Sequence, residues 1–468
     1  MNTDAALLTL AEAVAAVRKR EISARALTEA CLARIERLQP VLNCFIRIDA
    51  DRALAAADAA DQATARGEAL GPLHGVPLAH KDMFYRAGTV ATCGSKIRSD
   101  FVPGHTATVL ERLDAAGAIS LGMLNMAEFA VGPTGHNTHW GDCRNAWNPA
   151  HIAGGSSSGS GAATAARLCF GALGSDTGGS IRTPAAVNGL FGLKPTTGRV
   201  SRHGAMGLSF TLDTVGPLAR TAEDCALLFS IIAGADPKDP TSAQSKPVTL
   251  PPRLDGDIAG LRIGVPRRPP ALDPEIEAKR VESLAVLEGL GARLVELDVP
   301  EDGILADLGN LVMGVEAATL HLQWLRERPE DYQPQVLGRL LPGLSYPGVA
   351  YLEALQARPH YLTQFTTAVL DQCDALHWPV LPMKVPTRAA TDIGAGDGMQ
   401  DMIRRLSAFT RPLNYLGLPG LAMPVGFDED GMPVSFQLIG RPFDELTLLR
   451  IGHAVDQATG ISRRTPPV

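Results

Sequence analysis

Residues 151–184, HIAGGSSSGSGAATAARLCFGALGSDTGGSIRTP, gather eight glycines and six serines around a short apolar segment. A flexible Gly/Ser linker would not be interrupted by the apolar helix AATAARLCF and the strand-like FGALGS. Two glycine-rich turns, GGSSSG and DTGGS, each precede a possible helix start, where free backbone N–H groups can face an anion or an oxyanion. We therefore expect a folded binding or catalytic site here.

Such turns can bind a phosphate group or can carry a nucleophilic serine. The chain lacks both G-x-x-x-x-G-K-[ST] and a G-x-G-x-x-G followed by an acid about 20 residues later, which disfavours a nucleotide site. A nucleophilic serine needs a base within hydrogen-bond reach. The string GGSIR around Ser180 is not a G-x-S-x-G pattern, and no histidine has an obvious role as its partner.

A buried lysine is the alternative base, because desolvation can lower its pKa from about 10.4 toward about 7. Lys81 stands at the end of the apolar strand in GVPLAHKDMF, where burial would be costly unless it serves a purpose. The other interpretation is a solvent-exposed lysine at a strand end, paired with Asp82. This segment alone leaves both interpretations open.

Strands and helices alternate outward from the glycine-rich stretch. Hydrophobic patterning and turn residues predict helices at 23–38, 51–66, 106–116, 161–168 and 274–289, and strands at 76–80, 118–121, 261–266, 293–300, 421–427 and 434–438. Ser23 is the expected N-cap of the first of these helices. The alternation predicts an α/β sheet covered by helices.

The composition is that of a compact folded protein. The 468 residues are 45% hydrophobic and 20% charged, which excludes disordered, collagen-like and coiled-coil classes. A formal net charge of -7 offers no electrostatic footprint for nucleic acid or an anionic membrane. The seven cysteines are scattered without a C-x-x-C spacing, and no basic leader or apolar run of about 20 residues is found. We therefore expect a cytoplasmic protein without disulfides or a zinc site.

Several motifs resemble those of the amidase signature family of serine hydrolases. GGSSSGSGAA, GSDTGGSIRTPAA and GLKPTTGRVS are similar to the signature region of that family, and PLHGVPLAHKD is similar to its lysine motif. NMAEFA, RNAWNP, LDTVGPLARTAEDCALL, LGLPGLAMPVGF and QLIGRPFDE also fit. The resemblance covers roughly residues 65–235 and 405–455. It implies an α/β fold with a large, mixed, twisted β-sheet and helices on both faces.

The resemblance also implies how the chain is divided and what it binds. We expect a single domain over 1–468, made of an N-terminal helical segment (1–66), a signature core (67–235), a linker (236–260), a variable substrate-selecting region (261–404) and a C-terminal part of the core (405–468). The expected partners are a small-molecule amide substrate and a second copy of the chain in a homodimer. No metal, organic cofactor, membrane or direct nucleic-acid contact is expected.

The family's catalytic triad of serine, cis-serine and lysine falls on Ser180 as nucleophile, Ser156 as bridging serine and Lys81 as base. Neutral Lys81 would accept a proton from Ser156, whose hydroxyl accepts one from Ser180, and water would later hydrolyse the acyl-enzyme. The resemblance implies a cis peptide at Ser156 and a supporting hydrogen-bond role for Ser157. Without Lys81 and Ser180, Ser156 would be interpreted as an ordinary helix N-cap.

The turn around the nucleophile is expected to form an oxyanion hole, because glycine permits both unusual backbone angles and close approach. Asp176 and Arg182 flank this turn and are expected to hold it, with an ordinary surface ion pair as the alternative. The expected backbone donors are Thr177, Gly178, Gly179 and Ser180.

The resemblance implies that the variable region selects the substrate. We favour a stand-alone amidase that hydrolyses a small amide with an apolar or aromatic acyl or amine side. The candidates for lining its pocket are Met126, Thr134, Met313, Trp324, Tyr346 and Phe409, with Met83 and Phe84 after the lysine.

Other functions stay open. The motifs are also similar to the glutamine-hydrolysing A subunit of a tRNA-dependent amidotransferase, in which a stretch like LSAFTRPLN carries an aspartate for the glutamine amino group. Ser407 stands at that position here, and Arg339 matches the arginine that binds the carboxylate. Loss of the acid would weaken glutamine binding, which favours the stand-alone amidase. Ester or carbamate hydrolysis uses the same acyl-enzyme chemistry, whereas a silent scaffold is disfavoured because the triad is intact.

Overall fold

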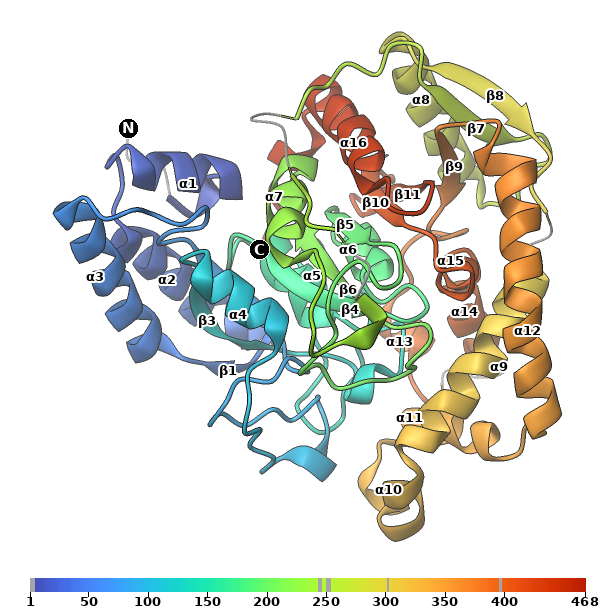
Figure 1. Cartoon of the computed structure of the whole chain (residues 1–468), viewed down its shortest axis with the longest axis horizontal. Coiled ribbons are helices and arrows are strands. Elements are labelled where there is room, and N and C mark those ends of the chain that lie inside the picture. Colours follow the sequence, from blue (N-terminus) through green and yellow to red (C-terminus); the bar gives the residue numbers. More distant parts are fainter. Residues whose placement is uncertain (1–4, 243–245, 250–253, 301–302, 395–397) are drawn as a thin grey trace.

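The computed structural model describes residues 5–242, 246–249, 254–300, 303–394 and 398–468, which form a mixed sheet of 11 strands with helices around it (Figure 1). In space the strands follow the order β1-β3-β2-β4-β6-β5-β10-β11-β9-β7-β8. Their bounds are β1 Phe45–Ile48, β2 Pro77–Lys81, β3 Ile119–Leu124, β4 Ala172–Asp176, β5 Phe191–Lys194, β6 Thr214–Ala219, β7 Arg262–Pro266, β8 Arg293–Leu297, β9 Ala375–Pro379, β10 Gly420–Phe427 and β11 Pro433–Ile439. The expected α/β class is confirmed.

Parallel pairing is confined to two parts of the sheet. β2 runs parallel to β3 and β4, and β7 runs parallel to β8 and β9, whereas the remaining neighbours are antiparallel. Ala79 of β2 pairs with Ala172 of β4, and His80 pairs with Leu173, so the two strands end at the same edge. Ligands of open α/β sheets bind beyond the carboxyl ends of parallel strands, so a binding site is expected at this edge.

Helices cover both faces of the sheet. A Cβ added to Gly452 would lie 3.2 Å from Phe191 Cε1, and one added to Gly192 would lie 2.5 Å from Ala185 Cβ. Successive strand residues face opposite sides, so the helices of Gly452 and Ala185, α16 and α6, cover opposite faces. The helices are α1 Leu10–Arg18, α2 Ala24–Leu42, α3 Ala50–Arg66, α4 Thr108–Ala115, α5 Ser158–Ala165, α6 Arg182–Val187, α7 Ala222–Ile232, α8 Pro274–Gly289, α9 Gly303–Leu320, α10 Leu322–Glu327, α11 Pro334–Leu340, α12 Gly348–Phe365, α13 Arg388–Thr391, α14 Met399–Arg405, α15 Arg411–Leu416 and α16 Glu445–Thr459.

The elements expected from the sequence are present, with ends displaced by a few residues. Ser23 Oγ accepts the Ala26 N–H at 3.0 Å, which makes it the N-cap of α2 as predicted. The N-terminal segment is not only helical, because β1 pairs antiparallel with β3 and extends the sheet. Residues 243–245 and 250–253 of the expected linker lie outside the described residues.

Helix α9 is long and apolar enough to span a membrane, judged by length and composition alone. It packs against α12, α15 and the 3-10 turn Leu341–Leu344, and part of it lines the cavity described below. Core helices of soluble proteins meet the same criterion, so the criterion carries little weight for α9.

Candidate active site

Lys81 is the last residue of β2 and is fully buried. Its Nζ lies 2.7 Å from Ser156 Oγ and 2.9 Å from Ser175 Oγ. Burial lowers the pKa of Lys81 from its usual 10.5 to about 7, and the negative charges of Asp213 and Asp176 oppose that shift in part. A substantial fraction of Lys81 is therefore neutral near pH 7 and able to accept a proton.

The alternative of a solvent-exposed Lys81 paired with Asp82 does not hold. Asp82 is buried as well, and its carboxylate accepts hydrogen bonds from the Thr92 N–H at 2.9 Å and from the Thr92 hydroxyl. Lys81 therefore contacts the two serines, and Asp82 bonds to Thr92 instead of pairing with Lys81. The hydroxyl of Ser175, which also contacts Lys81, was missed by sequence reasoning although it lies within the glycine-rich stretch.

Ser156 follows a cis peptide bond from Gly155 and precedes helix α5 by two residues. The N-cap position of α5 belongs to Ser157, so the N-cap interpretation of Ser156 is wrong. Ser157 Oγ accepts the Ser175 N–H at 3.3 Å, and the Ser157 N–H donates to the Ser180 carbonyl at 3.3 Å. Ser157 therefore ties the strand of Ser175 to the turn of Ser180, with Ser156 held beside Lys81.

A fully buried ion pair holds the turn that carries Ser180. Arg182 Nη2 lies 3.0 Å from Asp176 Oδ1, and Arg182 Nε lies 3.0 Å from Asp176 Oδ2. The same carboxylate accepts the N–H groups of Gly179 at 2.7 Å and Ile181 at 3.1 Å. Burial alone would raise the pKa of Asp176, but the Arg182 charge and these hydrogen bonds hold it well below its usual range. The alternative of a surface ion pair is therefore wrong.

Two amide side chains from the C-terminal part of the chain complete this support. Gln437 Oε1 accepts a hydrogen bond from Arg182 Nη1 at 2.9 Å, and Asn414 Oδ1 accepts one from Arg182 Nη2 at 2.7 Å. Asn414 Nδ2 also donates to both the carbonyl and the carboxylate of Asp176 at 2.9 Å. Sequence reasoning missed both residues. Their signal was that each is the one amide side chain in its motif, LSAFTRPLN or QLIGRPFDE.

One of the four expected oxyanion donors is already in use, because the Gly179 N–H bonds to Asp176. Gly179 has a φ of +127°, and an added Cβ would lie 2.2 Å from Thr410 Oγ1, so this position needs glycine. The Thr410 hydroxyl donates to the Gly178 carbonyl at 2.7 Å. The candidate donors to an oxyanion are thus the N–H groups of Thr177, Gly178 and Ser180.

Thr177 links the nucleophile turn to a buried carboxylate. Its hydroxyl donates to Asp213 Oδ1 at 2.5 Å, and Asp213 Oδ2 accepts the N–H groups of Leu208 and Ser209 at 2.8 and 3.0 Å. Burial raises the pKa of Asp213, and these hydrogen bonds counteract part of that rise. Asp213 therefore fixes the orientation of Thr177, and its charge also acts on Lys81.

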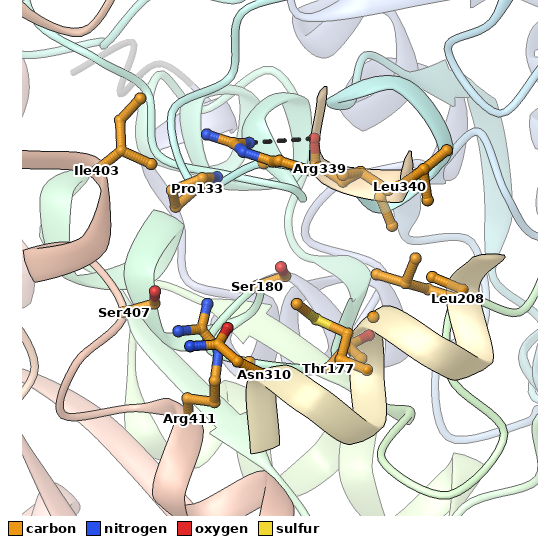
Figure 2. Close-up of a pocket in the computed structure, with 18 of the residues that line it drawn as sticks. Pro133, Thr177, Ser180, Leu208, Asn310, Arg339, Leu340, Ile403, Ser407 and Arg411 are labelled. Atoms are coloured by element: carbon orange, nitrogen blue, oxygen red, sulfur yellow. Dashed lines mark hydrogen bonds between the residues drawn. The ribbon is translucent and has the colours of Figure 1, made fainter. Parts of the chain in front are cut away.

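Ser180 opens into a cavity of about 630 Å³ (Figure 2). One side, here called the nucleophile wall, is the nucleophile turn with Gly155. The opposite side, the substrate wall, consists of α9, α11, the turn Leu341–Leu344 and residues 400–411, and residues 130–133 and Leu208 complete the lining. Within the described structure no hydrogen bond joins the hydroxyls of Ser180 and Ser156. Catalytic hydrogen bonds are often long before substrate binds, so this does not remove Ser156 as the proton acceptor.

The cavity is lined differently from what the sequence suggested. Met313 and Tyr346 do line it. The other four candidates are not among the lining residues: Met126 and Thr134 are buried, the half-buried Trp324 stacks on Phe129 with ring centroids 5.3 Å apart, and the buried Phe409 packs edge-on against Trp378. Met83 and Phe84 are buried as well and are not among the lining residues.

Several polar and charged residues line the cavity. Both Ser407 and Arg339 line it, as does Arg411, which sequence reasoning missed. The other polar or charged side chains of the substrate wall are Asp307, Asn310, Gln400 and Arg404. No group of three or more His, Cys, Asp or Glu that could hold a metal ion is found in the described part of the chain.

The chain is similar to known amidases and amidotransferase subunits over almost its entire length. The family model described as Amidase matches residues 26–449. The A subunit of the Glutamyl-tRNA(Gln) amidotransferase of Halorhodospira halophila is 42% identical over 486 residues, covering 98% of each chain. A solved structure described as an unexpected vestigial protein complex that reveals the evolutionary origins of an s-triazine catabolic enzyme has a TM-score of 0.90 and 36% identity, over 98% of this chain and 100% of that one. The native peptide amidase from Stenotrophomonas maltophilia has a TM-score of 0.84 and 29% identity, over 98% of both chains. The chain belongs to the amidase family.

Proposed function

We propose that this chain hydrolyses the C–N bond of a small linear amide through an acyl-enzyme on Ser180. The observation that carries the proposal is the contact of 2.7 Å between Lys81 Nζ and Ser156 Oγ, made by a fully buried lysine beside the cavity that Ser180 lines. A lysine whose pKa is about 7 can serve as the base that activates a serine at neutral pH.

The reaction follows from the order of these groups. Ser180 Oγ attacks the amide carbonyl and passes its proton to Ser156, while the Ser156 proton moves to Lys81. The backbone N–H groups of the turn stabilise the oxyanion. Collapse of the tetrahedral intermediate breaks the C–N bond, and the leaving amine or ammonia takes a proton through Ser156. Water, deprotonated by the same relay, then attacks the acyl-enzyme and releases the carboxylic acid.

Glutamine hydrolysis as the A subunit of an amidotransferase is the second candidate function. It is favoured by the 42% identity to such a protein over almost the entire chain. Arg339, at the position that the resemblance assigns to the carboxylate of glutamine, lines the cavity. In that case the released ammonia would be handed to a partner protein, and the isolated chain would be inactive or a weak glutaminase.

A hydrolysis screen on the purified chain separates the two candidates. Ammonia or amine release is measured with glutamine and with a panel of aliphatic and aryl amides, anilides, carbamates and esters, using Ser180→Ala as the blank. Turnover of amides with glutamine inert supports the first candidate. Activity with glutamine alone, or none until a partner protein is added, supports the second. An absence of turnover together with a failure of serine-reactive phosphonates to label Ser180 would overturn both.

A further inference from the structure

Two arginines of the cavity lack a carboxylate partner. Arg339 and Arg411 both line it, and neither forms an ion pair with any described residue. Arg339 Nη1 is 3.5 Å from the Val131 carbonyl, a long contact, and Arg411 Nε is buried with no hydrogen-bond partner. In Figure 2 the two side chains approach from different sides, with Ser180 between them in this view.

The position of Arg411 is set by two glycines. A Cβ added to Gly309 of α9 would lie 3.1 Å from Arg411 Cγ, and one added to Gly178 would lie 3.3 Å from Nε and 3.8 Å from Nη2. The stem of Arg411 therefore runs along α9, and its guanidinium lies against the nucleophile turn, two residues before Ser180. A substrate whose carbonyl is next to Ser180 must pass close to this guanidinium.

The charge in the cavity is predominantly positive. Burial lowers the pKa of Arg411 to about 10, the charge of Arg339 adds to that shift and the charge of Asp307 opposes it, so both arginines stay protonated at neutral pH. Arg404 is already paired with Asp401 at 2.5 Å. Asp307 is the one carboxylate among the lining residues of the described chain, and it is exposed at the start of α9. Two half-buried guanidinium groups thus face the cavity with only the exposed Asp307 to offset their charge, which indicates that a ligand supplies further negative charge.

We infer that the substrate is a short amide bearing a carboxylate near the scissile carbonyl, and that Arg411 binds this carboxylate. This inference rests on the proposed amide hydrolysis at Ser180. A guanidinium can hold a carboxylate through two parallel hydrogen bonds, which fixes the acyl chain beside the nucleophile. An ammonium group on the same substrate would face two arginines and the uncharged Ser407, with the exposed Asp307 as the one carboxylate of the described lining, so monoamides of dicarboxylic acids fit better than glutamine.

The inference adds a carboxylate to the apolar or aromatic substrate expected from the sequence. Of the six lining candidates, Met313 and Tyr346 do line the cavity, whereas the other four, Met126, Thr134, Trp324 and Phe409, are not among the lining residues. The overall reaction is hydrolysis of a monoamide of a dicarboxylic acid by one water, which yields the dicarboxylate and ammonium. No other reactant is needed.

The test compares matched substrates and matched variants. Kinetic constants are measured for malonamate, succinamate and glutaramate, for the neutral butanamide and pentanamide, and for glutamine. We expect kcat/KM for the best monoamide to exceed that of its neutral isostere by about 10- to 100-fold, the range of a charge-assisted hydrogen bond. Arg411→Met should remove most of that preference by raising KM for the carboxylated substrates, and Arg411→Lys should retain part of it.

The control is Arg405→Met, at an arginine that lies outside the cavity lining and 3.6 Å from Asp273. It should leave the preference intact. Equal turnover of neutral and carboxylated amides would overturn the inference while the proposed function stands. If no amide is turned over, binding of succinate and glutarate to the Ser180→Ala protein is measured by calorimetry. Absence of binding then overturns the inference, and phosphonate labelling of the unmodified chain decides separately on Ser180.

Discussion

The two walls of the cavity differ in how their polar groups are satisfied. On the nucleophile wall, the Asp176 carboxylate and the Arg182 guanidinium are fully buried and bond to each other, to backbone N–H groups and to two amide side chains. On the substrate wall, Arg339 and Arg411 have no such partners among the described residues. The charged groups of the nucleophile wall have their partners without a ligand, whereas the arginines of the substrate wall gain a negatively charged partner only when a ligand binds.

This difference matches what each wall has to do. Groups that stabilise a transition state are most effective when their orientation is fixed in advance, because no reorganisation is then needed during the reaction. Groups that select a substrate act through interactions with that substrate, so their charges stay unpaired until it arrives. Changes on the first wall should therefore alter kcat or stability, and changes on the second should alter KM.

The sharpest test of the nucleophile wall is Ser180→Ala. It removes the attacking oxygen, so we expect a loss of at least about 10⁴-fold in kcat, as for other serine hydrolases. The midpoint of thermal unfolding should stay close to that of the unmodified chain, because Ser180 lies at the cavity surface. Covalent labelling by a serine-reactive phosphonate should disappear. Labelling that persists at another serine would show that this other serine is the nucleophile.

A second test uses the protonation of Lys81. Its pKa is lowered by burial to about 7, and the base must be neutral, so kcat/KM should rise with pH and level off above about pH 7. A lysine with its usual pKa would give a rate that keeps rising to about pH 10. Lys81→Ala should lower kcat by about 10²- to 10⁴-fold and flatten the profile in this range. An unaffected rate would exclude Lys81 as the base.

Lys81, Ser156 and Ser180 were predicted from the resemblance to a known family, whereas the residues alone pointed to a folded site in the glycine-rich stretch and left the role of Lys81 open. Ser156 and Ser180 lie within one stretch of 34 residues, in which Ser175 was missed, and Lys81 ends a strand that pairs beside the strand of Ser175. Glycine permits backbone angles and close approaches that other residues rarely adopt, so a glycine-rich stretch marks a site without fixing where each side chain goes. The contribution of Gln437 was not predictable, because it depends on a strand more than 200 residues later in the chain.

The substrate wall was poorly predictable for a different reason. An apolar residue fits both a packed interior and a cavity wall, and hydrophobic periodicity does not distinguish between them. Trp324 and Phe409 were expected in the pocket for this reason and pack against other rings. Arg411 reaches the cavity because α15 packs on α9. These segments are far apart in the sequence, so no local pattern predicts their contact.

The third test probes the stability of the nucleophile wall through Asp176→Asn. The change leaves the fully buried Arg182 without a negative partner, and breaking a buried pair in this way costs about 3–5 kcal/mol of folding free energy. Chemical denaturation measures this. The matched control is Asp401→Asn, which breaks the exposed pair with Arg404 and should change the free energy of unfolding by about 1 kcal/mol or less. Equal effects of the two variants would contradict the proposed role of the buried pair.

The smallest expected effect belongs to the substrate wall. Met313 is half-buried on α9 and lines the cavity, so Met313→Ala removes apolar contact with the substrate and leaves the catalytic groups in place. A loss of about 1 kcal/mol would raise KM by roughly five-fold, with kcat close to that of the unmodified chain. Thr319→Ala, at an exposed position of the same helix outside the cavity lining, serves as the control. A fall in kcat with unchanged KM would mean that α9 also positions the nucleophile turn, and the separation between the two walls would then be incomplete.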